Sequence, residues 1–246
     1  MSVRLLTPYE KNHLTNFGLS LDEIGKYGKM PVEYITGQAR FLDQYFVVNK
    51  DVLIPRVETE ELAERIVNKY KDKKTVNFLE VGTGSGAIGI AIFQKLSDLG
   101  VNVSCVLSDV SPKALLVAQK NINNLVEKKQ SIKLVESNLL SNIDDLEFDF
   151  CVANLPYIPS SRINQLDESV KDFEPLLALD GGEDGLILIK KLIRELTEKK
   201  FVGDVFLEVD DTHDDQIILS VGGELKDIWK DSFNKNRFAY IKIKKD

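Results

Sequence analysis

The amino-acid sequence predicts an α/β fold, with a Rossmann-like parallel sheet that is covered by helices on both faces. After Lys74, apolar runs typical of buried strands alternate with helical patterns, as they do in βαβ units. A glycine-rich turn between Gly82 and Gly86 follows the first of these strands. At 246 residues the chain is long enough for one large domain with a modest appendage.

Three units are expected along the chain. They are a short N-terminal helical segment at 1–30, a β-hairpin region at 31–57 and a large catalytic domain at 58–246. In the first unit, Ser20 and Glu23 form a possible capping box before a brief helix. In the second, the runs 40–48 and 52–54 are rich in aromatic and β-branched residues, and the turn-like Asn49-Lys50-Asp51 joins them into a predicted hairpin.

The large domain opens with a helix at 58–71, which has apolar residues at helical spacing, acids in its first turn and lysine in its last. The elements predicted after it are strands at 76–81, 101–108, 132–136, 148–153, 204–209, 224–229 and 238–244, and helices at 87–99, 112–125 and 186–199. Ser111 is the expected N-cap of the second of these helices, and Pro112 takes its first position. A loop at 156–185 is long enough to be a candidate substrate-covering segment.

The composition limits the kinds of partner and the cellular location that we expect for this protein. The net charge of −7 and the pI near 5.1 argue against binding driven by phosphate neutralisation, although a local basic patch stays possible. Cys105 and Cys151 lie in apolar strand-like runs and are expected to be reduced core thiols. No stretch reaches the ~18 apolar residues of a membrane span, so we expect a cytoplasmic protein without a membrane partner.

The first strand ends in Glu80-Val81-Gly82-Thr83-Gly84-Ser85-Gly86, a loop that lets a ligand approach the backbone. No Lys-Ser or Lys-Thr follows the glycines, which excludes a Walker-type phosphate loop. Asp109 ends the second strand, twenty-three positions after Gly86, where its carboxylate can accept the two ribose hydroxyls of a nucleotide. Folds that bind dinucleotides share this pattern. The alternative for Asp109 is an acidic side chain without a binding role, which faces solvent at the end of its strand.

A second motif, Asn154-Leu155-Pro156-Tyr157, follows the fourth strand. The Asn154 side-chain oxygen and the Leu155 carbonyl can accept both hydrogens of a substrate amide, Pro156 stiffens the turn, and Tyr157 can stack on a flat group. Together with Glu80 and the glycine spacing, this motif predicts an S-adenosylmethionine-dependent methyltransferase acting on an amide or amine nitrogen. The chemistry needs no metal or covalent intermediate. With His13 and His213 the only histidines, the acids around His213 are interpreted as a solvated turn in which Thr212 caps a short helix.

Several longer strings resemble the HemK/PrmC family of glutamine methyltransferases, which modify the Gly-Gly-Gln motif of peptide chain release factors. The resemblance covers the chain from Pro31 to about Lys244. The matching strings are Pro31-Val32-Glu33-Tyr34-Ile35-Thr36-Gly37, Leu53-Ile54-Pro55-Arg56-Val57-Glu58-Thr59-Glu60, the loop Gly82 to Gly86 with Ala87-Ile88, Asp109 with Ser111-Pro112, Glu174-Pro175, Ala178-Leu179-Asp180-Gly181-Gly182 and Asp184-Gly185-Leu186.

The resemblance implies a class I S-adenosylmethionine-dependent methyltransferase fold and a role in translation termination. It implies that the Gly82 to Gly86 loop and Asp109 bind S-adenosyl-L-methionine, which leaves as S-adenosyl-L-homocysteine. Asn138 and Leu139, after the third strand, would flank the adenine, and Asn154 to Tyr157 would bind the glutamine. The partners would be peptide chain release factors. Members of the family usually have a longer helical N-terminal domain that helps to engage them, whereas only about thirty residues precede Pro31 in this sequence.

Two alternatives stay open at this point. The family usually reads Asn-Pro-Pro-Tyr, whereas Leu155 stands in this chain, and Asn-Leu-Pro-Tyr also resembles the motif of ribosomal RNA adenine dimethylases. An adenine exocyclic-amine methyltransferase acting on rRNA or DNA is therefore the second enzyme hypothesis. The third is a donor-binding module without catalytic activity.

Overall fold

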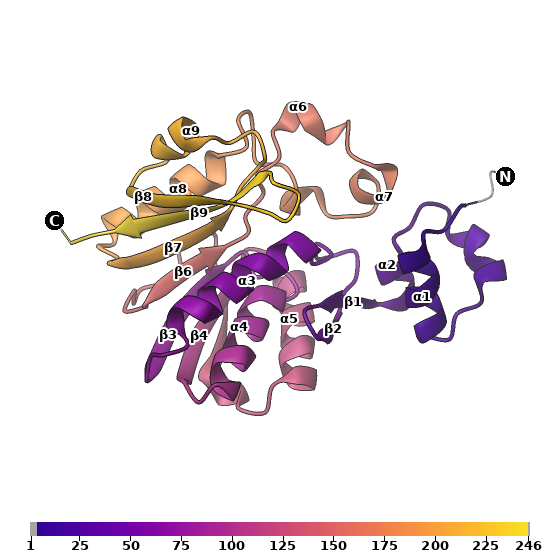
Figure 1. Ribbon diagram of the computed structural model, residues 1–246, viewed down its shortest axis with the longest axis horizontal. Coiled ribbons are helices and arrows are strands. Elements are labelled where there is room, and N and C mark those ends of the chain that lie inside the picture. Colours follow the sequence, from indigo (N-terminus) through magenta and orange to yellow (C-terminus); the bar gives the residue numbers. More distant parts are fainter. Residues whose placement is uncertain (1–3, 246) are drawn as a thin grey trace.

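The computed structural model describes residues 4–245 and contains a seven-stranded sheet of order β5-β4-β3-β6-β7-β9-β8 (Figure 1). Its strands are β3 (Thr75–Val81), β4 (Asn102–Asp109), β5 (Ile132–Glu136), β6 (Phe150–Ala153), β7 (Gly203–Glu208), β8 (Glu224–Lys230) and β9 (Asn236–Ile243). Strands β3 to β7 pair in parallel, and β9 is antiparallel to both β7 and β8. The predicted α/β fold with a mostly parallel sheet is confirmed.

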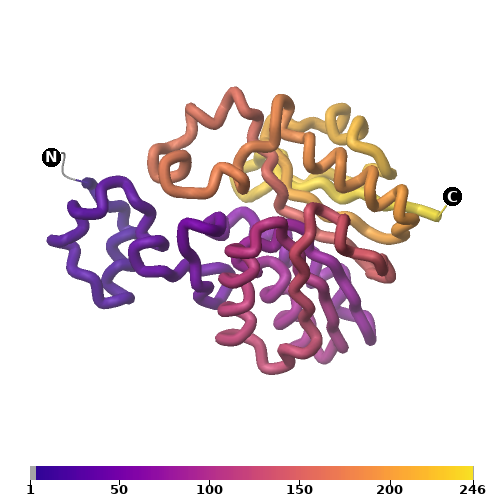
Figure 2. The backbone as a smooth tube through the Cα atoms, turned by 180° about the vertical axis from the view of Figure 1, so that it is seen from behind, coloured from indigo at the N-terminus to yellow at the C-terminus, as the bar shows by residue number. Residues whose placement is uncertain are grey.

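Helices cover both faces of this sheet. The helices are α3 (Val57–Tyr70), α4 (Ala87–Asp98) and α5 (Pro112–Leu125) on one face, and α8 (Ile187–Glu198) and α9 (Asp215–Leu219) on the other; the short 3₁₀ helix η2 (Lys129–Ser131) precedes β5. Figure 1 shows α3 and α4 on the near side, and Figure 2 brings α8 to the front. Side chains along a strand alternate between the two faces of the sheet. Phe78 of β3 therefore packs into the hydrophobic core on the side of α3, α4 and α5, and Leu79 packs into the core on the side of α8 and α9.

Local signals account well for the ends of these elements. The Ser111 hydroxyl accepts a hydrogen bond from the Ala114 backbone N–H at 3.2 Å, and Pro112 takes the first position of α5, as predicted. Cys105 of β4 and Cys151 of β6 are buried and free. Within residues 4–245, no helix combines the length and apolar character needed to cross a bilayer.

The N-terminal segment has a small core of its own, around Leu14 and Ile24. Its elements are α1 (Pro8–Asn16), the 3₁₀ helix η1 (Leu21–Tyr27) and α2 (Val32–Thr36). Ser20 caps η1, but the predicted capping box is wrong, because the Glu23 carboxylate pairs with Lys26. The capping box lies instead at the start of α1, where Thr7 is the N-cap and Glu10 the third helical residue; this helix was not predicted from the sequence.

The hairpin exists but is shifted from its predicted position. Its strands are β1 (Gln38–Phe41) and β2 (Gln44–Val47), so the chain turns at Leu42, which adopts a left-handed φ of 52°. The run 52–54 is not a strand. The Val52 N–H bonds the Asn49 carbonyl in a turn, and the Ile54 N–H donates to the Glu174 carboxylate at 3.2 Å instead of to a neighbouring strand.

The predicted loop at 156–185 contains three short helical turns, α6 (Ser160–Ile163), α7 (Glu168–Lys171) and the 3₁₀ turn η3 (Leu176–Ala178). Figure 1 shows this segment reaching toward the N-terminal segment, and Lys29 Nζ lies 3.8 Å from Glu168 Oε2. The segment begins just after β6, at the carboxyl end of that strand.

Candidate active site

A cavity of about 480 Å³ opens at the carboxyl ends of the parallel strands. The chain passes outward from β3 through β4 to β5 and then returns to β6 on the other side of β3, so the strand order reverses between β3 and β6. Open α/β sheets bind ligands at such a switch point. The volume lies within the roughly 300–1,000 Å³ of small-molecule sites.

The structure brings most of the predicted site residues to this cavity. Its lining includes Gly82, Thr83, Gly84, Ser85, Asp109, Asn138, Leu139, Asn154, Leu155 and Pro156. Glu80, Gly86 and Tyr157 do not line it. Gly86 caps α4, Glu80 lies under the loop and accepts from Thr83, and Tyr157 donates to Glu208, which is not a lining residue. The lining also contains Thr59, to which no sequence motif had assigned a role.

Asp109 holds the glycine loop in place. One carboxylate oxygen accepts the Gly84 N–H at 2.8 Å and the other accepts the Ser111 N–H at 2.9 Å. With only 9% of its surface exposed, Asp109 is not a solvated acid. Burial raises its pKa, against the lowering effect of the backbone donors. Each carboxylate oxygen can accept a second hydrogen bond, so binding of ribose hydroxyls stays a prediction.

The cavity fits a nucleoside-containing donor at the loop. Gly84 has a left-handed φ of +55°, and a side-chain carbon there would meet no protein atom within 4 Å. Glycine thus leaves free the space beside Asp109 that a ligand would fill. After the next strand, β5, Asn138 and Leu139 reach the same cavity, and the Asn138 N–H donates to the Ser141 hydroxyl at 3.2 Å.

Glu80 is a fully buried carboxyl group under the loop. Its Oε2 accepts from the Thr83 hydroxyl at 2.6 Å and from the Gly89 N–H at 3.1 Å, whereas Oε1 has no partner among the residues that the structure describes. Burial raises the pKa of Glu80 to about 8, although the bonds from Thr83 and Gly89 lower it. The group is therefore largely protonated in the unliganded protein near neutral pH.

Replacing Glu80 with glutamine is expected to flatten the pH dependence of folding stability. The folded carboxyl keeps its proton up to a pH near 8, whereas the unfolded carboxyl loses it near its ordinary value. As the pH rises between these values the unfolded state is favoured, which costs the wild type up to about 1.4 kcal/mol per pH unit. Denaturant midpoints without donor, from about pH 5 to about pH 8, measure this slope. Parallel profiles for wild type and Glu80→Gln would contradict the raised pKa.

The acceptor motif leaves β6 beside the end of β7. Ala153 of β6 pairs with Leu207 of β7. The residues that follow this pair, Asn154 and Glu208, therefore lie side by side. Asn154 Nδ2 donates to Glu208 Oε2 at 3.0 Å, and the Tyr157 hydroxyl donates to Glu208 Oε1 at 2.7 Å. The motif thus rests on a buried carboxylate.

Leu155 replaces the usual first proline of the motif without opening the structure. Its side chain is only 5% exposed and packs on the glycine loop, where a Cβ on Gly82 would lie 3.0 Å from Leu155 Cδ2. Within residues 4–245, no hydrogen-bond donor reaches the Leu155 carbonyl. This oxygen is free to accept from a substrate.

An ion pair connects two strings that are far apart in sequence. Arg56 donates to Glu174 Oε1 at 2.7 Å, and the other oxygen of Glu174 holds the Ile54 N–H. Arg56 lines the cavity, while the Glu174 side chain is 1% exposed. The pair ties the segment after the hairpin to the loop that follows the acceptor motif.

The glycine-rich string at 181–185 supports the acceptor motif from behind. The Gly181 N–H donates to the Ile158 carbonyl at 2.9 Å, and the Ile158 N–H donates to the Leu179 carbonyl at 3.1 Å. At Gly185 (φ +75°) a side-chain carbon would lie 2.2 Å from the Tyr157 carbonyl oxygen. Close backbone contact therefore explains why these positions are glycine.

The acids around His213 form hydrogen bonds within a turn. His213 Nε2 lies 2.9 Å from the Asp184 carbonyl, and no cluster of three metal-ligating side chains occurs in the described part of the chain. The prediction that Thr212 caps the next helix is wrong. Asp214 caps α9 by accepting from the Ile217 N–H at 2.9 Å, while the Thr212 hydroxyl bonds Asp210.

Comparison with known sequences finds one kind of protein repeatedly. The Methyltransferase small domain family matches residues 58–173. A release factor glutamine methyltransferase of Leptospira interrogans is 36% identical over 97% of this chain and 82% of its own length. One of Lactococcus lactis is 34% identical over 90% of this chain and 82% of its length. One of Clostridium acetobutylicum is 39% identical, but only 56% of its length is covered.

Solved structures support the fold. A ribosomal protein L11 methylase of Lactobacillus delbrueckii subsp. bulgaricus has a TM-score of 0.51 and 20% identity, over 77% of this chain and 80% of that one. A candidate S-adenosylmethionine-dependent methyltransferase of Streptococcus mutans has a TM-score of 0.55 and 10% identity, over 84% of this chain and 55% of that one. At such low identity the likeness concerns the fold alone.

Proposed function

This chain belongs to the release factor glutamine methyltransferase family, and we propose that it methylates the side-chain amide nitrogen of the glutamine in the Gly-Gly-Gln motif of peptide chain release factors. The methyl donor is S-adenosyl-L-methionine. One observation carries the proposal: a single cavity joins the glycine loop and Asp109 to Asn154 and Leu155. Donor and acceptor sites thus share one space at the strand switch point.

The donor end of the cavity has the groups that a nucleoside with a charged amino-acid tail requires. We assign the loop at 82–86 and Asp109 to the tail and ribose, and Asn138 and Leu139 to the flanks of the base. Glu80 acts from behind by holding Thr83 and Gly89. When bound, S-adenosyl-L-methionine supplies an electrophilic methyl group on a positively charged sulfur.

The acceptor end orients a weak nucleophile. An amide nitrogen shares its lone pair with the carbonyl, so its reaction depends on alignment with the methyl group. The Asn154 side-chain oxygen and the Leu155 carbonyl would each accept one N–H of the glutamine amide. Pro156 stiffens the turn, and Tyr157 supports it through its hydroxyl bond to Glu208. Stacking of the Tyr157 ring on the substrate stays a prediction.

Adenine methylation in rRNA or DNA is not favoured. The relatives of Leptospira interrogans and Lactococcus lactis, of which this chain covers 82% of the length, are both named release factor glutamine methyltransferase. Together with the net charge of −7, this also makes a nucleic-acid partner less expected. We further propose a cytoplasmic location, and an appendage formed by residues 1–30 and 31–57 that contacts the release factor beside the catalytic domain at 58–246.

Mass spectrometry of a release factor, incubated with the protein and donor, tests the proposal. We expect one added methyl on the peptide that contains Gly-Gly-Gln, and none when its glutamine is replaced by alanine. A parallel reaction with isotopically labelled donor and ribosomal RNA measures the adenine alternative. Incorporation into RNA alone would overturn the proposed substrate.

A further inference from the structure

We propose that Glu208 is a positioning residue of the acceptor site, which fixes the side-chain amide of Asn154 so that its oxygen faces the substrate. The inference rests on the proposed function, because the substrate amide is the group that this oxygen would contact. Glu208 lies at the carboxyl end of β7, behind the cavity wall, and 1% of its surface is exposed.

Three donors converge on the Glu208 carboxylate. Oε2 accepts from the Thr59 hydroxyl at 2.6 Å and from Asn154 Nδ2 at 3.0 Å, and Oε1 accepts from the Tyr157 hydroxyl at 2.7 Å. The donors come from α3 and from the turn after β6, so only the folded sheet unites them. A buried carboxylate is stable when several hydrogen bonds satisfy it.

This arrangement permits one orientation of the Asn154 amide. If the amide were flipped, its oxygen would face the carboxylate, and two acceptors would oppose each other in a buried place. The observed orientation points Oδ1 away from Glu208, and Asn154 lines the cavity. Donation to Glu208 also polarises the amide and increases the negative charge on Oδ1, which strengthens its bond to a substrate N–H.

The same carboxylate holds the other end of the motif. Tyr157 donates to the oxygen that Asn154 does not use, so Glu208 braces the turn at its first and last residues. The Thr59 hydroxyl donates to Glu208 and lies 3.5 Å from Asn154 Nδ2. The acceptor geometry therefore depends on a residue that does not line the cavity.

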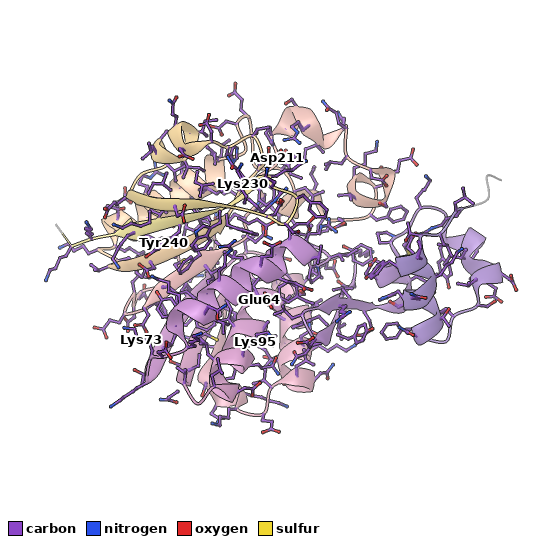
Figure 3. The ribbon with its side chains drawn as sticks, in the orientation of Figure 1. Glu64, Lys73, Lys95, Asp211, Lys230 and Tyr240 are labelled. Carbon is purple, nitrogen blue, oxygen red and sulfur yellow. The ribbon has the colours of Figure 1, made fainter. Side chains whose placement is uncertain are left out.

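The test compares Glu208→Gln with Asp204→Asn. Asp204 is the matched control, because it is a buried acid on the same strand that also accepts tyrosine hydroxyls, from Tyr70 at 2.8 Å and Tyr240 at 3.0 Å. It lies at the opposite end of β7. Figure 3 labels Tyr240, whose hydroxyl bonds Asp204, and Asp211, which comes three residues after Glu208 in the chain; the two labels lie apart in the view.

We expect Glu208→Gln to lower kcat on a release factor by about 10- to 100-fold, as the loss of partners that orient a reactive group does in other sites. Donor affinity, measured by calorimetry, should stay at the wild-type value. Asp204→Asn should lower the melting temperature but keep kcat. If both variants lose stability and neither loses kcat, Glu208 is only a structural residue and the proposal fails.

A double variant tests whether Glu208 acts through Asn154. Once Asn154 is alanine, the additional change Glu208→Gln should lower kcat little further, because the group to be oriented is gone. If Glu208→Gln lowered kcat in the Asn154→Ala background as much as it does in the wild type, Glu208 would not act through Asn154.

A spectroscopic measurement does not depend on turnover or on folding of a Glu208 variant. In the wild type, the side-chain N–H₂ signals of Asn154, identified by their loss in Asn154→Ala, should exchange slowly with water. The exposed Asn123 provides the reference for fast exchange. Slow exchange without methylation of any release factor would retain the positioning role and refute the proposed substrate. Exchange as fast as that of Asn123 would refute the positioning role.

Discussion

Replacing Asn154 with alanine is expected to lower kcat by about 10²- to 10³-fold, the scale on which the loss of one preorganised polar contact acts in other enzymes. Donor affinity should stay near the wild-type value, because the loop at 82–86 and Asp109 remain in place. Asn154 Nδ2 bonds Glu208 at 3.0 Å, so truncation removes both the substrate acceptor and its support. Single-turnover rates and calorimetric donor titration measure the two quantities separately.

Asn123→Ala is the control for this experiment, since Asn123 lies exposed on α5, away from the cavity lining. It should leave both quantities unchanged. If Asn154→Ala lost donor affinity as strongly as rate, Asn154 would belong to the donor site, and its assignment to the glutamine would be wrong.

Replacing Gly185 with alanine is expected to destabilise the fold by about 2–5 kcal/mol and to remove most of the activity. The added Cβ would lie 2.2 Å from the Tyr157 carbonyl oxygen, and the φ of +75° is itself unfavourable for alanine. Because the contact is with backbone, the turn that carries Asn154 and Tyr157 must shift. Denaturant midpoints and kcat on a release factor measure the two effects.

Gly100→Ala separates the two causes. Gly100 has a similar φ of +84°, but a Cβ there would meet nothing within 4 Å. Its substitution should cost only the conformational term, about 1–2 kcal/mol, and leave kcat unchanged. Equal losses of stability and rate in the two variants would mean that the contact with Tyr157 is unimportant.

The alternating part of the fold could be predicted because its signals are local. Ser111 and Pro112 mark the start of α5, and the apolar runs mark each strand of the parallel sheet. The hairpin was misplaced because its turn at Leu42 carries no glycine or proline, whereas Asn49-Lys50-Asp51 is turn-like but lies outside it. Helix α1 was missed, although Thr7 and Glu10 carry its capping box.

The candidate active site likewise has residues that the sequence predicts and contacts that it does not predict. Gly84, Asp109 and Asn154 could be predicted because each lies at the end of a strand or shortly after it, and parallel strands end at one edge of a sheet. The hydrogen bond from Asn154 to Glu208 could not be predicted from the sequence. It requires β7 to pair next to β6 in the register that joins Ala153 to Leu207, a fact about tertiary pairing that no local pattern in the chain carries.

The hydrogen bond between Thr59 and Glu208 has a consequence for the order of assembly during synthesis. It spans 149 positions, and its carboxylate lies on a strand made late, after the donor loop and Asn154 have already emerged. Long-range pairing of this kind must await the later strand. A nascent chain that ends before β7 therefore has the sequence of the donor pocket but lacks the carboxylate that bonds the Asn154 amide, so the acceptor site is complete only after β7 has been made.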